Sequence, residues 1–252
     1  MIAAILLSKL GNQLFQLATA YHLAKVTKQE LVLIENGNTC FQPYNLILNN
    51  KKVLKNGDLN AILIEEPYTQ PLMDLSIVKN YDNVILKGYF QSDKYFTRQD
   101  VEELFPIPSQ IQDKYAYLKD YCCISVRRGD YLLLGDMFLC PPVEWYERMY
   151  HKHFEGKKVL ICSDDIEWCK NNFHLQNQEF LENDGTTPEE RVFIMAMCKN
   201  HIISPSTFSW WAAYLSGEDS KVVAPNQWFG KGLAHLNQED KYCSFFIKEP
   251  LN

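Results

Sequence analysis

The chain has 252 residues, of which 46% are hydrophobic and 22% charged, and its 25 Lys and Arg against 31 Asp and Glu give a formal net charge of -6. This length supplies a core for one large domain or two small ones. The acidic balance argues against non-specific nucleic-acid binding, because phosphate neutralisation needs a basic face, so any anion site must be a local concentration of arginine.

The predicted elements of the first half begin with a strand at the apolar N-terminus. A turn over 8–11 leads into a helix whose residues 14, 17, 18 and 21 share one apolar face. The stretch from about 36 to 81 has Asn, Gly and Pro between short apolar runs and predicts no clear element. Pro106, Pro108 and the polar run 109–112 indicate a linker or a domain edge. The predicted strands are 2–7, 30–35 and 84–90.

The second half alternates strands and helices throughout. Such alternation is typical of βαβ units and parallel sheets. Two blocks with a polar join therefore predict an α/β protein of two doubly wound domains, over 1–112 and 113–252. The predicted strands are 122–126, 158–162, 179–181, 201–203 and 221–224, and the predicted helices are 142–154, a segment capped by 163–165 that ends near 172, 188–199 and 206–215.

Cysteine use and the N-terminus bear on the compartment. The eight cysteines form no C-x-x-C pair, and the neighbours Cys122 and Cys123 would point to opposite faces of a strand, which argues against a shared metal. We interpret them as reduced core thiols in a reducing compartment. The apolar start lacks a basic region and a cleavage site, and no apolar run reaches about 18 residues. We expect a cytoplasmic protein without a transmembrane segment, although peripheral contact with a membrane stays open, and no oligomeric state is indicated.

Two adjacent arginines, Arg127 and Arg128, follow the apolar run 121–124, and Gly129 and Asp130 come directly after them. Guanidinium is always charged and presents a planar fork of donors that matches phosphate oxygens. The pair therefore indicates an anion site at a strand end. The alternative is a surface pair bonded to local carboxylates.

Further polar residues also follow predicted strands. Asp164 and Asp165 come after the strand 158–162, and Ser206 and Thr207 after the strand 201–203. Ligands of doubly wound folds bind beyond the carboxyl ends of the strands. One crevice could therefore hold these residues together with the arginines.

Several common site motifs are absent from the sequence. There is no P-loop, no G-x-G-x-x-G after the first strand and no G-x-S-x-G elbow. His151 and His153 lie two apart on a predicted helix, so they do not share a face for a metal. Since no D-x-D occurs either, arginines and helix N-termini would have to stabilise a bound phosphate.

Five segments in order resemble the bacterial-type α-1,2-fucosyltransferases of glycosyltransferase family 11. They are similar to that family's G-x-L-G-N-Q-x-F-Q, G-Y-F-Q-S…Y-F, H-x-R-R-G-D-Y, S-D-D-x-x-W and S-N-S-T-F-S-W-W-A motifs. The matching segments are 10–16, 88–92 with 95–96, 126–131, 163–165 with Trp168, and 204–212.

The resemblance implies a GT-B fold, with two Rossmann-like domains facing a cleft. It implies an inverting, metal-independent transfer of L-fucose from GDP-fucose, a co-substrate rather than a cofactor, to the 2-hydroxyl of a terminal galactose or similar sugar of an oligosaccharide or glycan precursor. The N-terminal domain would take the acceptor and the C-terminal domain the donor. Two alternatives remain, namely another nucleotide sugar on the same scaffold, or a sugar-nucleotide- or carbohydrate-binding protein without catalysis.

The chain departs from the family pattern at three places. Ser125 stands where the family has a histidine, Pro205 replaces an asparagine, and Ser8 and Lys9 replace glycines. In related fucosyltransferases that histidine lies near the nucleotide. The identity of the donor is therefore less firmly implied than the type of reaction.

The resemblance implies catalytic roles for three residues that follow the predicted strand 122–126. We expect Arg128 and Arg127 to stabilise the negative charge that develops on the departing β-phosphate, with Arg128 as the direct contact. Asp130 would orient an arginine through an ion pair, or else take the proton of the acceptor hydroxyl.

Binding roles are predicted for the other motif residues, each beside a structural alternative. The start of the helix at Ser206 would hold the diphosphate, or serve as an ordinary N-cap. Asp164 and Asp165 would accept hydrogen bonds from guanine or ribose, or cap a helix. Trp210 and Trp211 are expected in the core. The predicted donor-binding residues are Asn12, Gln13, Ser125, Asp164, Asp165, Ser206, Thr207 and Phe208, with helix capping as the alternative for the first two, and Tyr89 and Gln91 are weaker candidates for acceptor contacts.

Overall fold

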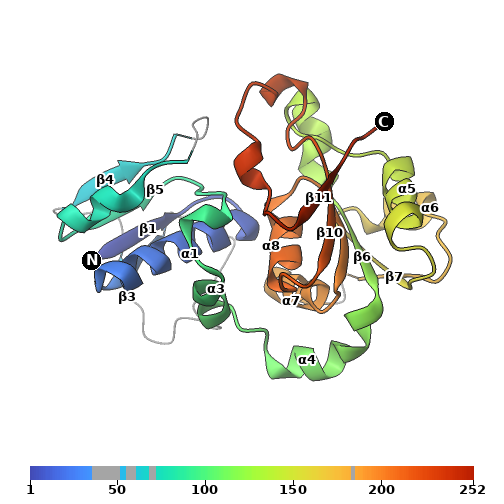
Figure 1. Cartoon of the computed structure of the whole chain (residues 1–252), viewed down its shortest axis with the longest axis horizontal. Helices are drawn as coiled ribbons and strands as arrows, with labels where there is room; N and C mark the ends of the chain where they lie inside the picture. Colours follow the sequence, from blue (N-terminus) through green and yellow to red (C-terminus); the bar gives the residue numbers. More distant parts are fainter. Residues whose placement is uncertain (36–51, 55–60, 68–71, 183–184) are drawn as a thin grey trace. The chain divides into compact units, whose positions relative to one another are not determined.

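The computed structural model describes residues 1–35, 52–54, 61–67, 72–182 and 185–252. The chain forms two compact units, Met1–Pro106 with Glu239–Lys241, and Ile107–Gln238 with Tyr242–Asn252. Each unit contains its own parallel sheet (Figure 1). None of the helices among these residues is long and apolar enough to cross a membrane.

The first unit has a five-stranded sheet in the order β3-β2-β1-β5-β4. All its pairings are parallel. The central strands are buried apolar runs, as expected for parallel strands covered on both faces, and α1 (Leu10–Thr27) packs along β1. The strands are β1 (Ile2–Leu6), β2 (Leu31–Glu35), β3 (Lys52–Leu54), β4 (Ile62–Glu65) and β5 (Val84–Lys87).

The strand predicted over 84–90 ends earlier, at Lys87. Gly88 then turns the chain, and Phe90 has a φ of 49°, which strand geometry does not allow. The region without a clear prediction contains β3, β4 and the 3₁₀ helix η1 (Leu75–Asn80), while 36–51, 55–60 and 68–71 lie outside the described residues. Two further short helices are η2 (Asp93–Tyr95) and α3 (Arg98–Leu104).

Asp100 ties α3 to α1. It forms a capping box with Thr97 at the start of α3. The same carboxylate lies 2.7 Å from Nδ1 of His22 and 3.1 Å from Nζ of Lys25, both on α1. Burial alone would raise the pKa of Asp100, but hydrogen bonds from Thr97, His22 and Lys25 outweigh it and lower the pKa from 3.8 to about 2.

This lowered pKa predicts acid sensitivity of the first unit. Because the folded state holds Asp100 ionised more strongly than the unfolded chain does, the carboxylate stabilises the fold by about 2 kcal/mol above roughly pH 4–5. We expect this contribution to disappear as the pH falls towards 2. Hydrogen exchange of the 98–104 peptide should be faster in Asp100→Asn than in wild type at pH 6, and the difference should shrink at pH 2.5. Equal exchange at pH 6 would contradict the assignment.

The second unit has a six-stranded sheet in the order β11-β10-β9-β6-β7-β8, again parallel throughout. From β6 the chain runs through β7 to β8 on one side, then returns to β9 and runs outward on the other. This is the doubly wound order, with its switch point between β6 and β9. The strands are β6 (Cys122–Val126), β7 (Val159–Ser163), β8 (Gln178–Phe180), β9 (Asn200–Ile203), β10 (Lys221–Pro225) and β11 (Phe246–Glu249).

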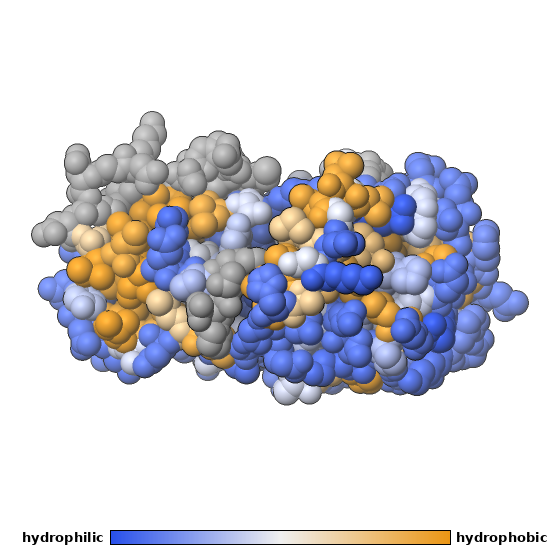
Figure 2. Space-filling view, turned by 90° about the horizontal axis from the view of Figure 1, so that it is seen from above, coloured by the Kyte–Doolittle hydropathy of each residue, from blue (hydrophilic) through white to orange (hydrophobic). Residues whose placement is uncertain are grey.

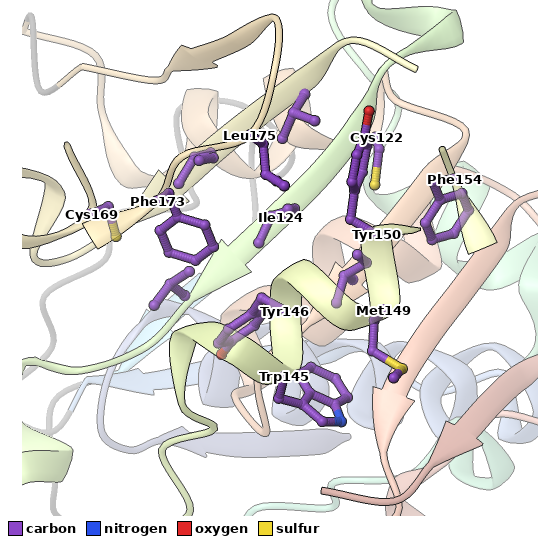
Figure 3. Packing of buried hydrophobic residues seen from close by; sticks show 14 of the residues in the cluster. Cys122, Ile124, Trp145, Tyr146, Met149, Tyr150, Phe154, Cys169, Phe173 and Leu175 are labelled. Atoms are coloured by element: carbon purple, nitrogen blue, oxygen red, sulfur yellow. The ribbon is translucent and has the colours of Figure 1, made fainter. Parts of the chain in front are cut away.

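Helices cover both faces of this second sheet (Figure 1). On one side, α5 and α6 pack on the apolar face that β6 presents through Cys122, Ile124 and Val126 (Figure 3). On the other side lie α7 and α8, which carries the buried Trp210 and Trp211. The helices are α4 (Ser109–Tyr115), α5 (Val143–His153), α6 (Ile166–Asn172), α7 (Pro188–Ala196) and α8 (Thr207–Leu215), with 3₁₀ helices η3 (Ala116–Asp120), η4 (Gly129–Met137), η5 (Lys231–Leu233) and, in the first unit, η6 (Glu239–Lys241).

Three details of the second unit differ from the sequence prediction. The polar run interpreted as a linker forms the first turn of α4, immediately after the division between the units. The strand β11 was not predicted, because the short run Phe246–Glu249 ends in polar residues. The helix predicted to reach 199 ends at Ala196.

The cysteines and the histidine pair lie in structural positions. Cys122 belongs to the core under α5, whereas Cys123 is 3.9 Å from Cys162 between their sulfur atoms, on the opposite face. His151 contacts Glu155, and His153 contacts Glu249 instead.

Candidate active site

The predicted site residues of the second unit gather at the carboxyl edge of its sheet. Arg127 and Arg128 follow β6, and Ser204 to Ser206 follow the neighbouring strand β9. The Ser204 N–H donates to the Ser125 carbonyl at 3.0 Å, which extends the pairing beyond β9. The residues therefore lie on either side of the switch point, where doubly wound folds bind ligands.

Arg127 is held by two carboxylates. Its guanidinium forms ion pairs with Asp130 and, at 2.7 Å, with Asp164 after β7. The Tyr131 ring lies 5.2 Å from the guanidinium carbon, and the Tyr131 hydroxyl donates to the Pro205 carbonyl at 3.3 Å. Arg127 thus links the three strand ends, and the ion pair expected of Asp130 is present.

Arg128 is held differently. Its backbone N–H donates to Asp164 at 3.0 Å, and its Nε contacts Asp165 at 3.3 Å. The guanidinium carbon lies 3.5 Å from the ring centroid of Trp168. Among the described residues, the two Nη groups have no hydrogen-bond partner, and 19% of the side chain is exposed. Local carboxylates therefore satisfy Arg127, as the alternative interpretation expects, while the Nη fork of Arg128 stays available to an anion.

Both aspartates of the S-D-D segment contact arginines. Asp165 also caps α6, because its carboxylate accepts the Trp168 N–H at 3.3 Å. Neither side chain is more than half exposed. The structure thus brings Asp164 and Asp165 together with the arginine pair, and the predicted contacts to guanine or ribose stay predictions.

Gly129 provides the space that Asp164 occupies. A Cβ added at this position would collide with the Asp164 carboxylate. We expect Gly129→Ala to push that carboxylate off both arginines and lower kcat by about 10- to 100-fold, since small misplacements of catalytic groups have effects of this order. Steady-state kinetics would check this, with Gly232→Ala as the control, because a Cβ added at Gly232 meets its nearest atoms at ordinary van der Waals distances, the shortest 3.4 Å. Equal kcat in both variants would contradict the role of Gly129.

The start of α8 faces the same edge. Ser206 is the N-cap residue, but its side chain makes no capping hydrogen bond, and its N–H donates to Ser204. Thr207 and Phe208 are half-buried. The first N–H groups of a helix lack intrahelical acceptors and attract anions. This geometry suits the predicted diphosphate contact. The hydrogen bond from the helix to the Ser206 side chain, which an ordinary N-cap would make, is absent.

Ser125 is buried, at 4% exposed. Its hydroxyl lies 2.6 Å from that of Ser209 on α8, and the Ser209 hydroxyl lies 3.1 Å from that of Ser204. The side chain therefore packs β6 against α8. A direct contact of Ser125 with a nucleotide stays a prediction.

In the first unit, a second polar group lies at the carboxyl ends of β1 and β5. The Gln91 side chain donates to Asn12 at 2.7 Å, and Asn12 donates to the Ser8 hydroxyl at 2.9 Å. Gln13 is fully buried and donates to the Ser8 carbonyl at 2.8 Å, which holds the turn where Ser8 has a φ of 66°. Gln13 thus supports the turn, and Asn12 and Gln91 meet above it.

Glu66 organises the turn that follows β5, and the sequence interpretation missed it. Its carboxylate accepts the Tyr89 N–H at 3.0 Å and the Phe90 N–H, and it accepts the Tyr95 hydroxyl at 2.9 Å. Burial, followed by the Glu66 charge and hydrogen bond, raises the pKa of Tyr95. Only the sheet order, which places β4 beside β5, could have shown this partner.

Apolar side chains are exposed in both units. Figure 2 shows apolar patches that interrupt a mainly hydrophilic surface. In the second unit, four exposed apolar side chains lie on η4, directly after the arginine pair. The exposed large apolar residues include Ile62 and Leu63 in the first unit and Leu132, Leu133, Leu134 and Met137 in the second.

The family profile described as Glycosyl transferase family 11 matches residues 1–246. The chain belongs to glycosyltransferase family 11. The arginine pair, the S-D-D segment and the start of α8 are therefore parts of a glycosyltransferase, and the matched range covers both units.

Relatives of this family 11 member differ in the sugar that they transfer. The O-antigen biosynthesis glycosyltransferase WbnK of Escherichia coli is 26% identical over 87% of this chain and 92% of its own length. An α-1,2-colitosyltransferase of Escherichia coli is 31% identical over 56% of this chain. The galactoside 2-α-L-fucosyltransferase SEC1 of Bos taurus is 23% identical over 86%. The matched regions span 55% and 64% of the last two proteins.

Solved structures with the same fold include several fucosyltransferases. NodZ from Bradyrhizobium has a TM-score of 0.53 and 14% identity over 84% of this chain and 91% of NodZ. POFUT1 in complex with GDP has a TM-score of 0.56 and 12% identity over 88% and 97%. A family 9 glycosyltransferase from Veillonella parvula has a TM-score of 0.54 and 11% identity over 99% and 86%. These similarities show that the family 11 chain has the GT-B type of fold.

Proposed function

We propose that this family 11 protein transfers L-fucose from GDP-fucose to the 2-hydroxyl of a terminal galactose, or a similar sugar, on an oligosaccharide or glycan precursor. The family membership supports the type of reaction. The names of the bovine relative and of NodZ, whose crystals were soaked with GDP-fucose, support the donor. The linkage and the acceptor rest on the modest similarity to the galactoside fucosyltransferases.

The observation that carries the proposal is the state of Arg128. Asp165 occupies its Nε and Trp168 one face of its guanidinium plane, while its Nη fork is without a partner among the described residues. A planar fork fixed on one edge matches the oxygens of a phosphate. The first N–H groups of α8 are the second set of donors at this edge of the sheet.

In the proposed reaction, the acceptor oxygen attacks the anomeric carbon from the face opposite GDP. The bond between that carbon and the β-phosphate oxygen breaks, so the configuration inverts and GDP leaves with the electron pair, while the acceptor hydroxyl releases its proton to solvent. Negative charge grows on the β-phosphate, and preorganised donors in a site of low dielectric stabilise it most at that moment. Arg128 and the α8 N-terminus supply those donors, and Arg127 fixes Asp164 and Asp130 behind them.

We assign Asp130 to the ion pair with Arg127 rather than to proton abstraction, since the pair occupies one of its oxygens. Asn12, Gln13, Tyr89 and Gln91 are proposed to serve the binding of donor or acceptor in the first unit. Arginines and N–H groups supply all the charge stabilisation in this proposal, which therefore requires no metal.

A second candidate uses the same chemistry with another donor sugar. The colitosyltransferase relative and the buried Ser125 at the family's histidine position favour it. The third alternative, a binding protein without catalysis, predicts nucleotide binding and no product.

The test is incubation with GDP-fucose and a panel of galactosyl acceptors, with mass spectrometry of the products. We expect a mass gain of one deoxyhexose on an acceptor with a free 2-hydroxyl, none on its 2-deoxy analogue, and the same rate in excess EDTA. Parallel incubations contain other GDP-sugars, UDP-sugars or dTDP-sugars in place of GDP-fucose. Product only with one of these donors would favour the second candidate, and nucleotide binding without any product would favour the third.

A further inference from the structure

We propose that Trp168 is a positioning residue that holds the guanidinium of Arg128 in the orientation needed to bind a diphosphate. This inference rests on the proposed function, because it concerns the residue assigned to the departing phosphate. It goes further by giving a role to the aromatic member of the S-D-D-x-x-W segment.

One carboxylate places the ring and the cation together. Asp165 accepts the Trp168 N–H with one oxygen and contacts Arg128 Nε with the other, both at 3.3 Å. Trp168 is the third residue of α6, so the cap that starts the helix also fixes the backbone of the tryptophan. The guanidinium then lies on the indole, 3.5 Å from its centroid.

The hydrophobic core supports the Trp168 ring on which the guanidinium lies. Trp168 is half-buried and packs against the cluster under α5 and α6. Its ring meets Phe173 edge-on, at 6.4 Å and 87°, and Phe173 in turn lies 5.9 Å from Tyr146. Figure 3 shows Phe173 and Tyr146 within that buried cluster. The indole is thus a rigid platform that extends from the core to the edge of the sheet.

These contacts restrict the conformation of Arg128 at three points. The ring fixes the plane of the guanidinium, Asp165 fixes its Nε edge, and Asp164 fixes its backbone. The Nη fork is the part that remains to meet a ligand. A long side chain otherwise loses rotamer entropy when it binds, and an aromatic platform removes part of that cost in advance while attracting the cation.

The test compares Trp168→Leu and Trp168→Phe, each with and without Arg128→Ala. Binding of GDP and of inorganic pyrophosphate is measured by titration calorimetry, and kcat with GDP-fucose is measured where transfer occurs. We expect Trp168→Leu to weaken pyrophosphate binding and lower kcat by about 3- to 30-fold, and Trp168→Phe to recover most of both. In the Arg128→Ala background, Trp168→Leu should cause no further loss, because its effect passes through the arginine.

Trp228→Leu is the matched control. Trp228 is buried in the same unit, and its ring meets Tyr242 edge-on. Its effect on pyrophosphate binding should be less than 2-fold. Circular dichroism verifies that each variant is folded, and if Trp168→Leu is not, Trp168→Met, which also lacks an aromatic face, replaces it in the comparison with Trp168→Phe.

Two results would overturn the inference. One is unchanged pyrophosphate binding in folded Trp168→Leu, and the other is a loss that repeats in full in the Arg128→Ala background, as a purely structural role predicts. Failure of the proposed function is a separate outcome. In that case GDP-fucose yields no product, while the coupling between Trp168 and Arg128 in pyrophosphate binding is still measurable.

Discussion

Arg128→Ala is expected to lower kcat by about 10²–10³, the loss usual for removing one preorganised donor from a developing oxyanion. The structure gives the reason, because the Nη groups of Arg128 are oriented by Asp165 and Trp168 but occupied by no other described group. Steady-state kinetics with saturating donor would measure the loss. The Michaelis constant for the acceptor should change little, since the side chain is proposed to act on the phosphate.

Two further variants make the result specific. Arg128→Lys keeps the charge but loses the fork and the stacking, so it should recover only a small part of the rate. Arg148→Ala removes an exposed arginine of the same unit that contacts the Pro250 and Leu251 carbonyls, and it should keep wild-type kcat. A folded Arg128→Ala enzyme with wild-type kcat would remove the basis of the proposed mechanism.

Phe154→Ala is expected to destabilise the second unit by about 3–5 kcal/mol, the range for truncating a buried phenylalanine. Phe154 follows the last turn of α5, is 2% exposed and belongs to the cluster under α5 and α6. It lies at the end of α5 that is next to the start of β7, whereas the arginines follow the carboxyl end of β6. The folded fraction should therefore keep its kcat.

Tryptophan emission reports this unit alone, because all five tryptophans lie between 145 and 228. Urea unfolding followed at this emission would show the shift of the midpoint. Phe154→Leu keeps most of the volume and should cost less than half as much. Leu133→Ala, at a position 87% exposed, should change stability by less than about 0.5 kcal/mol. A midpoint for Phe154→Ala equal to that of Leu133→Ala would contradict its place in the core.

The strands and helices of the second unit follow closely from local sequence. Buried parallel strands are nearly continuous apolar runs, as Cys122–Val126 is with Ser125 as its single polar residue, and the helices begin at recognisable signals such as Asp165 before α6 and Pro188 in α7. The first unit was harder to predict. Its strands β3 and β4 are short, and the side chains of β4 are largely exposed, so no periodicity distinguishes them from loops.

By itself the sequence determined that the chain is α/β, that its polar motifs follow strands and that two arginines stand side by side, because these are properties of residues near one another in the chain. Only the tertiary structure decided that Arg127 is satisfied by Asp130 and Asp164 while Arg128 lies between Asp165 and Trp168. The physical reason is that these partners come from β6 and β7, whose carboxyl ends meet only when the strands pair. The different environments of two identical neighbours are a consequence of that pairing.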